Sequence, residues 1–298
     1  MIKMLGLGDN VCDIYLHTGI MYPGGQALNF AVYTSQLGVR ADYMGVFGQD
    51  AVARHIQSVM DQKGIGCTHC RSYSGENGFA RVTLVGGDRV FQGSNRGGVL
   101  QEHPIFLNQE DLDYIAGFDL VHTTNNGFID DLLPQLDQLS PKISYDFSYR
   151  WNEEERVDRV CPYVDFGFLS CSALSDKQTE ELCIHLCEKG CGMVTATRGE
   201  KGATVFDGKR FYRQLPTPVD LVDTMGAGDA FAAAMLVELV RMLKATPQYQ
   251  KREITSEMMI QALQHAADFS ARICLVHGAF DCGVQVPEEI RQKIYSEA

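Results

Sequence analysis

Residues 223–231 read DTMGAGDAF, in which three small residues stand between two acids just ahead of the apolar run FAAAMLVELV. The apolar run predicts a helix, and an acid in its first turn suits the positive end of the helix dipole. A plain helix start explains Asp229, but it does not explain Gly226, Ala227 and Gly228, whose backbone amides have almost no side chain to shield them. Amides that converge at a helix start form a natural site for an anion.

An acid directly after such a site would repel a bound phosphate. The pairing makes sense if Asp229 takes a proton from a hydroxyl group that attacks the phosphate. The amides of Gly226, Ala227 and Gly228 would then stabilise the charge that builds up on the transferred group. The stretch thus predicts phosphoryl transfer, with a simple helix cap as the alternative. The chain has no Walker A motif, no G-x-G-x-x-G at its first helix and no G-x-S-x-G.

The charge balance restricts the partners of this chain. Its 298 residues include 26 basic and 38 acidic side chains, which gives a net charge of −12. Such a molecule repels nucleic acids and anionic membranes, so we expect neither as a partner. The beginning MIKMLGLGDN contains no apolar stretch of the length of a signal peptide, and ten scattered cysteines favour free thiols. We therefore expect a soluble, cytoplasmic protein.

Strands and helices alternate along most of the chain, which is typical of a parallel sheet covered by helices on both faces. We expect strands at 2–7, 41–48, 118–122, 142–147, 164–169 and 192–197, and helices at 26–38, 51–64, 129–139, 175–189, 227–244 and 256–275. Residues 79–94 instead predict a hairpin around Gly86-Gly87-Asp88. With residues near 12–23, this hairpin could form a small sheet over a cleft.

Two motifs resemble those of one enzyme family. DTMGAGD at 223–229 is similar to the D-T-x-G-A-G-D signature of the ribokinase-like, PfkB-type carbohydrate kinases, and GGQALN at 24–29 matches their G-G-x-x-x-N. The resemblance implies one α/β kinase domain over 1–298, a three-layer sandwich with a central, mostly parallel sheet and a small β lid from about 12–23 and 67–98. The stretches GDNVCDIY, GGQALNFAVY, VDTMGAGD and VHGAF resemble the fructoselysine 6-kinase branch, which phosphorylates a sugar–lysine adduct.

The resemblance also implies an acceptor pocket. Asp13, near the end of the first strand, would accept hydrogen bonds from sugar hydroxyls, and Gly25 and Asn29 would line the same pocket, with a tight turn and a helix-face amide as the structural alternatives. For the amino-acid tail of the substrate, we expect Asp9 to meet the amine and Arg96, on the lid, to meet the carboxylate. Solvated surface positions are the alternative for these two.

The implied nucleotide site draws on three segments. Asp223 and Thr224 would lie beside the phosphates of ATP and a monovalent cation such as K⁺. Further contacts would come from Thr197, Gly199 and Gly202 and from His277, Gly278 and Ala279. Many relatives also carry N-x-x-E to organise Mg²⁺, whereas this chain has SCSA at 170–173, with no carboxylate. Mg²⁺ would then arrive bound to ATP, and the chain's own metal ligands stay unassigned.

Three interpretations of function follow. The first is an ATP-dependent kinase for fructoselysine or a related fructosamine; the second is a kinase of the same type for ribose, fructose, a keto-sugar acid or a nucleoside. The third is a sugar or nucleotide sensor without catalysis, which would not need a base such as Asp229 beside an anion site. Arg150, in DFSYR, resembles the last residue of the family's D-x-N-x-R stretch, where it would meet phosphate or form a surface salt bridge. Relatives often pair through their lids, which implies a homodimer.

Overall fold

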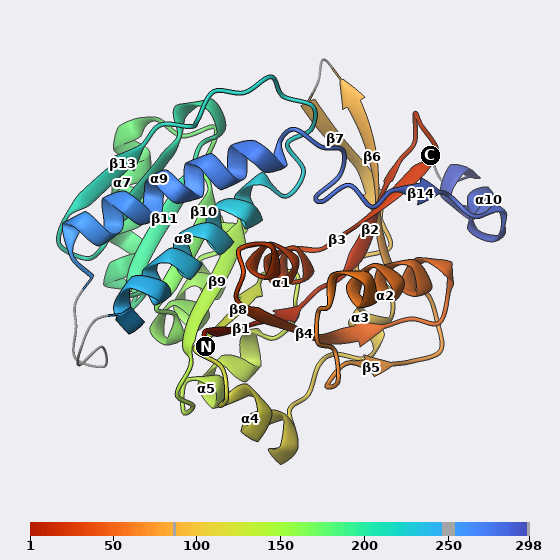
Figure 1. Cartoon of the computed structure of the whole chain (residues 1–298), viewed down its shortest axis with the longest axis horizontal. Coiled ribbons are helices and arrows are strands. Elements are labelled where there is room, and N and C mark those ends of the chain that lie inside the picture. The colour runs from red at the N-terminus through yellow and green to blue at the C-terminus, as the bar shows by residue number, and fades with distance from the viewer. Residues whose placement is uncertain (86–87, 246–253, 297–298) are drawn as a thin grey trace.

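A twisted sheet of nine strands runs through the centre of the molecule (Figure 1). The computed structural model describes residues 1–85, 88–245 and 254–296. In spatial order, the strands of the large sheet are β13 (Phe211–Gln214), β12 (Ala203–Phe206), β11 (Met193–Thr197), β10 (Phe166–Ser170), β9 (Lys142–Ser148), β8 (Leu120–Thr124), β1 (Lys3–Gly8), β4 (Arg40–Phe47) and β5 (Arg71–Ser72). From β5 to β11, neighbouring strands run parallel, and only β12 and β13 pair antiparallel.

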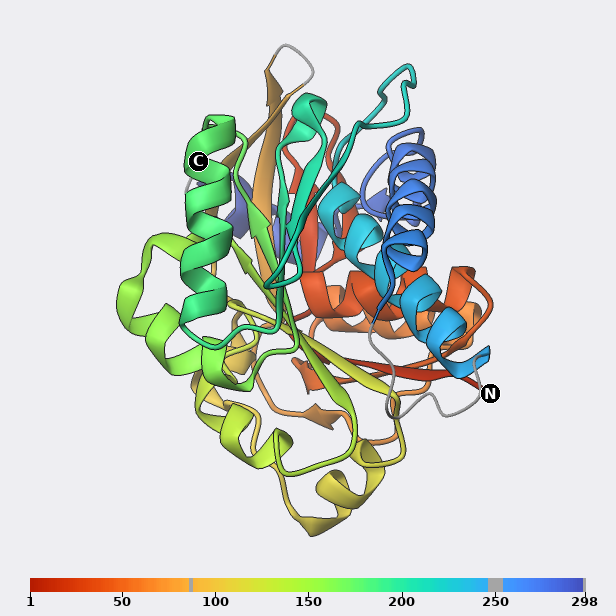
Figure 2. The same cartoon turned by 90° about the vertical axis from the view of Figure 1, so that its left-hand side faces the viewer.

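Helices cover both faces of this sheet (Figure 2). One face carries α1 (Gln26–Gln36), α2 (Ala51–Lys63), α8 (Ala227–Ala245) and α9 (Ser256–Ile273), which share one hydrophobic core. The other face carries α3 (Val99–Glu102), α4 (Gln109–Ile115), α5 (Leu133–Leu136), α6 (Glu154–Val160) and α7 (Asp176–Glu188), around a second core. The three-layer α/β sandwich with a mostly parallel sheet is therefore confirmed. Its strands are buried on both faces because helices lie above and below them.

A second, smaller sheet stands at one side of the molecule, at the upper right of Figure 1. Its order is β14 (Val284–Gln285), β3 (Ile20–Gly24), β2 (Val11–Tyr15), β6 (Gly78–Val85) and β7 (Asp88–Ser94). The hairpin partners β6 and β7 pair antiparallel, whereas β2 and β6 run parallel. The last helix, α10 (Glu288–Ser296), follows β14. The expected turn residues Gly86 and Gly87 lie outside the described residues, as do residues 246–253 of the linker between α8 and α9.

The helix expected at 129–139 is much shorter in the structure. A 3₁₀ turn at Asp130–Leu132 leads into α5, which ends at Leu136. Pro141 follows closely, and a proline disfavours helical backbone in the residue before it. Within the described ranges, no helix combines the length and the apolar character that crossing a bilayer requires.

Candidate active site

Asn29 of α1 and Asp229 of α8 are in direct contact where these two helices pack on each other. The Nδ2 atom of Asn29 donates a hydrogen bond to Oδ2 of Asp229 at 2.7 Å, and both side chains are buried. The Oδ1 atom of Asn29 is also buried and has no hydrogen-bond partner in the described part of the chain. A buried acceptor of this kind costs free energy unless a donor meets it, and a substrate hydroxyl can supply that donor.

Asp13 reaches the same place from β2. A Cβ atom built on Gly24 would lie 2.6 Å from Oδ2 of Asp13 and 4.0 Å from Oδ1 of Asn29, so both oxygens border this glycine. Gly25 has a φ of 107°, and its Cβ would lie 2.7 Å from Cα of Asn10. Only glycine accommodates both constraints. The structure thus brings Asp13, Gly25, Asn29 and Asp229 together, as the sequence predicts.

The turn before α8 is open on one side and closed on the other. Gly226 has a φ of 73°, and a Cβ atom on it would overlap the hydroxyl of Tyr33, which donates to the carbonyl oxygen of Ala279. Gly228 is exposed, and a Cβ there would meet nothing within 4 Å. The amide of Ala227 donates to the carbonyl oxygen of Thr224 at 3.2 Å, so this amide is used inside the turn. Of the three backbone amides expected to bind the transferred group, we therefore retain those of Gly226 and Gly228.

The side chain of Asp223, expected beside the phosphates of ATP, is held by several donors inside the protein. Its side chain is buried, and its Oδ2 accepts hydrogen bonds from the hydroxyl of Tyr15 at 2.5 Å and the amide of Gly278 at 2.9 Å. Its Oδ1 accepts from the amide of Met225 at 2.9 Å. This carboxylate therefore ties together the glycine turn, the segment 277–279 and strand β2 of the small sheet.

Two further segments of the expected nucleotide site occupy ends of elements. Thr197 ends β11, and its hydroxyl donates to the carbonyl oxygen of Leu169 at 3.2 Å. Gly199 and Gly202 follow with φ angles of 57° and 81°, and a Cβ on Gly202 would overlap the carbonyl oxygen of Gln214. His277 is exposed, whereas Gly278 and Ala279 are buried beside the glycine turn through the hydrogen bonds given above.

The two residues expected at the tail of the substrate differ in what they do. Asp9 is buried and caps the start of α1: it accepts hydrogen bonds from the amides of Gln26 and Ala27 and from the hydroxyl of Thr124. Burial raises the pKa of this carboxyl. Asp9 is therefore engaged inside the protein, and the prediction that it meets an amine is corrected. Arg96 is exposed in the turn after β7, with a φ of 56°.

The sequence motifs did not indicate two residues near the site, Tyr15 and Asp146. Tyr15 lies two residues after Asp13 on the same face of β2, and the period of two in a strand could have indicated it. Asp146, at the end of β9, is buried and accepts a hydrogen bond from the amide of Ser148 at 2.6 Å. Burial raises the pKa of Asp146, the hydrogen bond from Ser148 lowers it, the charge of Asp9 raises it and a hydrogen bond from Gln26 lowers it, and together they bring this pKa to about 7.

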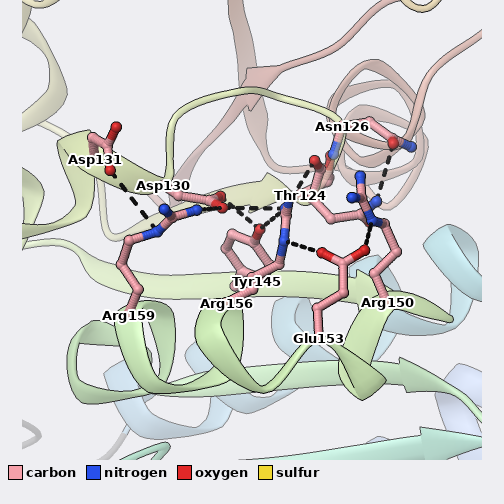
Figure 3. A network of polar contacts seen from close by, with 10 residues as sticks. Thr124, Asn126, Asp130, Asp131, Tyr145, Arg150, Glu153, Arg156 and Arg159 are labelled. Atoms are coloured by element: carbon pink, nitrogen blue, oxygen red, sulfur yellow. Dashed lines mark hydrogen bonds and ion pairs between the residues drawn. The ribbon is translucent and has the colours of Figure 1, made fainter.

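Arg156 of α6 lies at the centre of the polar network in Figure 3. Its Nη1 donates to the carbonyl oxygen of Asn125 and to the hydroxyl of Tyr145, both at 3.1 Å, and lies 3.2 Å from Oδ2 of Asp130. Its Nε donates to Glu153 at 3.0 Å. The network therefore fixes the turn that follows β8.

Arg150, for which contact with phosphate and a salt bridge were both open, forms an ion pair with Glu153 (Figure 3). Glu153 thus lies between the guanidinium groups of Arg150 and Arg156. This pairing holds the pKa of the Glu153 carboxyl below its ordinary value, and the hydrogen bond from Arg150 is the largest cause.

Two buried acids, Asp13 and Asp229, lie close to the amide of Asn29 beside the glycine turn that begins α8. In an α/β protein with a parallel sheet, this arrangement is typical of a kinase that acts on a hydroxyl compound. The family model described as pfkB family carbohydrate kinase matches residues 6–284, and the chain belongs to this family.

Curated relatives and solved structures agree with this assignment. Fructosamine kinase FrlD of Bacillus subtilis (strain 168) is 39% identical over 283 residues, which cover 95% of this chain and 94% of the relative. Fructoselysine 6-kinase of Escherichia coli (strain K12) is 33% identical, over 79% of this chain and 88% of the relative. The structure of Arabidopsis thaliana ribokinase complexed with ribose and ATP superposes with a TM-score of 0.76, covering 99% of this chain and 98% of that chain at 17% identity. The last similarity concerns the fold alone.

Proposed function

We propose that this kinase transfers the γ-phosphoryl group of ATP to the 6-hydroxyl of fructoselysine or a closely related fructosamine. The observation that carries the proposal is the 39% identity with a fructosamine kinase along nearly the whole chain. The acceptor pocket supports it, because Asp13, Asn29 and Asp229 offer acceptors for several sugar hydroxyls at once. An analogue without those hydroxyls would leave the buried Oδ1 of Asn29 without a donor.

In the proposed reaction, Asp229 accepts the proton of the attacking hydroxyl. The hydroxyl oxygen then forms a bond to the γ-phosphorus while the bond between that phosphorus and the bridging oxygen of ADP breaks. The products are the sugar phosphate, ADP and a proton that Asp229 releases to water. Asn29 holds the Asp229 carboxylate in place through its 2.7 Å hydrogen bond, and the amides of Gly226 and Gly228 face the transferred group.

ATP brings Mg²⁺ to this site as part of the substrate. In the described part of the chain, no group of three or more His, Cys, Asp or Glu side chains could hold a metal ion, which fits an ion held by phosphates and water. The residues do not fit a monovalent cation on Asp223, because hydroxyl and amide donors already surround its two oxygens. We therefore include no such cation in the mechanism.

For the tail of the substrate, Arg96 stays as the proposed partner of the carboxylate. Its guanidinium can bind a carboxylate with two parallel hydrogen bonds. The side chain is exposed at the root of the small sheet, where it is open to a ligand that extends out of the pocket.

A direct competition tests the proposed substrate. Fructoselysine, fructose, ribose and adenosine are offered to the enzyme at equal concentration with MgATP, and the phosphorylated products are quantified by mass spectrometry. Fructoselysine should dominate, and NMR of the product should show the phosphate on the 6-oxygen. Dominance of ribose or adenosine would overturn the substrate while leaving the kinase family intact.

The small sheet is the proposed lid over the acceptor, chiefly through β6 and β7. Closure on the sugar would exclude water that otherwise competes for the phosphoryl group. Addition of fructoselysine should slow amide hydrogen exchange in 78–85 and 88–94. Unchanged exchange at saturating substrate would contradict this role.

We further propose that two copies pair through this sheet. Strand β7 lies at its edge and exposes Phe91, which is 60% accessible, and Val90, which is 40% accessible. Unpaired strand edges with apolar side chains favour pairing with another chain. Light scattering after size exclusion should give twice the mass of the chain, and Phe91→Glu should give a monomer.

A further inference from the structure

Helix α1 connects Asp229 with the turn at Asn125–Phe128 through two hydrogen bonds. Asp229 binds Asn29, which lies one helical turn after the start of α1. At that start, the side chain of Gln26 accepts a hydrogen bond from Asn126 at 2.8 Å. The turn after β8 thus lies near enough to receive the other end of a sugar whose 6-hydroxyl is at Asp229. In fructosamines that other end carries the amine and the amino-acid part.

Phe128 is an unusual residue at the end of this turn. Its φ angle is 54°, in the left-handed region that bulky side chains rarely adopt. Its side chain is nevertheless 45% exposed, so burial of the ring does not offset the strained backbone. A Cβ atom on Gly97 would lie 3.5 Å from Cε2 of Phe128. The ring therefore packs against the turn after β7, at the residue that follows Arg96. Backbone strain that is not offset by burial of the side chain is typical of functional sites.

The rest of the protein holds this turn firmly. A Cβ atom on Gly127 would lie 3.2 Å from Cα of Gly8, at the end of β1, so the two backbones pack directly on each other. On the other side, Arg156 donates to the carbonyl oxygen of Asn125 at 3.1 Å. The side chain of Asn125 is buried, and its Oδ1 has no hydrogen-bond partner in the described residues. A fixed turn thus presents one apolar ring beside otherwise polar groups.

We infer that Phe128 determines specificity for fructosamines with an aliphatic amino-acid part, by packing its ring on the methylene chain that links the sugar nitrogen to the α-carbon. This inference rests on the proposed function. The lysine part of fructoselysine has an apolar chain with a charged end. Two neighbouring turns offer matching groups: the ring of Phe128, and Arg96, which directly precedes the Gly97 that lies against this ring. Arg156 acts as a positioning residue, because it holds the turn without facing the ligand.

The experiment compares three acceptors on purified wild-type enzyme, Phe128→Ala and Phe128→Gly. The acceptors are fructoselysine, the fructosamine of glycine, which lacks the methylene chain, and fructose. Loss of the ring should lower kcat/KM for fructoselysine about tenfold, as expected for methylene groups that lose their apolar cover. The other two acceptors should change by less than about twofold. The glycine variant tolerates the left-handed backbone, so it removes the ring without strain.

Phe106→Ala serves as the matched control, because Phe106 is an equally exposed phenylalanine that packs on Arg71, outside the acceptor pocket. It should leave all three acceptors unchanged. Equal losses for all three acceptors, or no loss for fructoselysine, would overturn the role of Phe128. If the wild-type enzyme phosphorylates fructose but neither fructosamine, the proposed substrate fails first, and the two failures are thereby distinguished.

Discussion

The two ends of the acceptor site are built in different ways. The transfer end consists of Asn29, Asp229 and the glycine turn, and its side chains are buried and bonded to one another. The proposed mouth consists of the turn 125–128 and the turn 96–98 after β7, where Phe128 and Arg96 are exposed and both have left-handed backbones. Enzymes that share one reaction need the same groups at the transfer end. The side chains of the mouth can differ with the substrate, because they are exposed and make few contacts with the rest of the protein.

The largest effect is expected at the transfer end, from Asp229→Asn. The amide cannot take the proton of the sugar hydroxyl, so kcat should fall about 100-fold to 10,000-fold, the usual contribution of a general base. The fall should appear equally with fructoselysine and fructose. Calorimetry should show normal ATP binding, and the unfolding temperature should stay close to that of the wild type. Near-normal turnover by the folded variant would remove Asp229 from the mechanism.

The glycine turn offers a matched pair of substitutions. Gly226→Ala places a side chain on a left-handed backbone and against Tyr33, so it should lower the free energy of unfolding by about 1–3 kcal/mol. It should also lower kcat, because the turn must shift away from the phosphate. Gly228→Ala meets open space and should leave stability unchanged while raising the KM for ATP. Denaturant unfolding measures the stability of both variants, and initial rates measure their activity. Equal stabilities of the two variants would contradict the close packing of Gly226 on Tyr33.

Tyr15→Phe tests the link between the glycine turn and β2. The variant leaves the buried Asp223 carboxylate with one donor fewer, which should cost about 1–3 kcal/mol of stability. Since Asp13 lies on the same strand, KM for the sugar should rise more than KM for ATP. An unchanged KM for both substrates would show that the contact stabilises the fold alone. Tyr212→Phe removes a half-buried hydroxyl that lies outside the pocket, and it serves as the control.

The smallest effect is a pH dependence near the mouth. The pKa of Asp146 is raised from 3.8 to about 7, so between these values the folded chain holds a proton that the unfolded chain has lost. Stability from this group is therefore present at low pH and decreases as the pH rises toward 7. Asp146→Asn keeps an acceptor for Ser148 and carries no charge. It should gain about 1–2 kcal/mol over the wild type at pH 8 and little at pH 5. A gain that does not depend on pH would contradict the raised pKa.

The sequence predicts the transfer end well for a physical reason. Its glycine turn, Asp229 and its helix are contiguous in the chain, and the amides of a helix start point the same way wherever the helix lies. Asp13 and Asn29 were found through the motif resemblance, and the structure brings both to Asp229. The helices at 227–244 and 256–275 also match α8 and α9 within two residues, because their apolar stripes are long.

The mouth could not be predicted, because its geometry depends on contacts between distant segments. The residues NNGF at 125–128 follow no period, and their position comes from Gly8 and from Arg156. Asp9 was misjudged for the same reason: the helix that it caps begins 17 residues later, after β2 and β3. The two-residue strand β14 joins the small sheet only because the end of the chain returns to β3.

The ties of Tyr15 and Tyr22 have a mechanical consequence for the small sheet. Tyr15 bonds to Asp223, and the backbones of Gly278 and Gly283 come so close to the ring of Tyr22 that neither position has room for a Cβ atom. The inner strands β2 and β3 are thus held to the glycine turn and to the segment 278–283 by direct contacts. Any movement of the small sheet would therefore have to take place in the β6–β7 hairpin beyond Val82, where the pairing of β6 with β2 ends. Gly97 lies against both Gly78 and the ring of Phe128, so the base of this hairpin is in direct contact with the turn at 125–128.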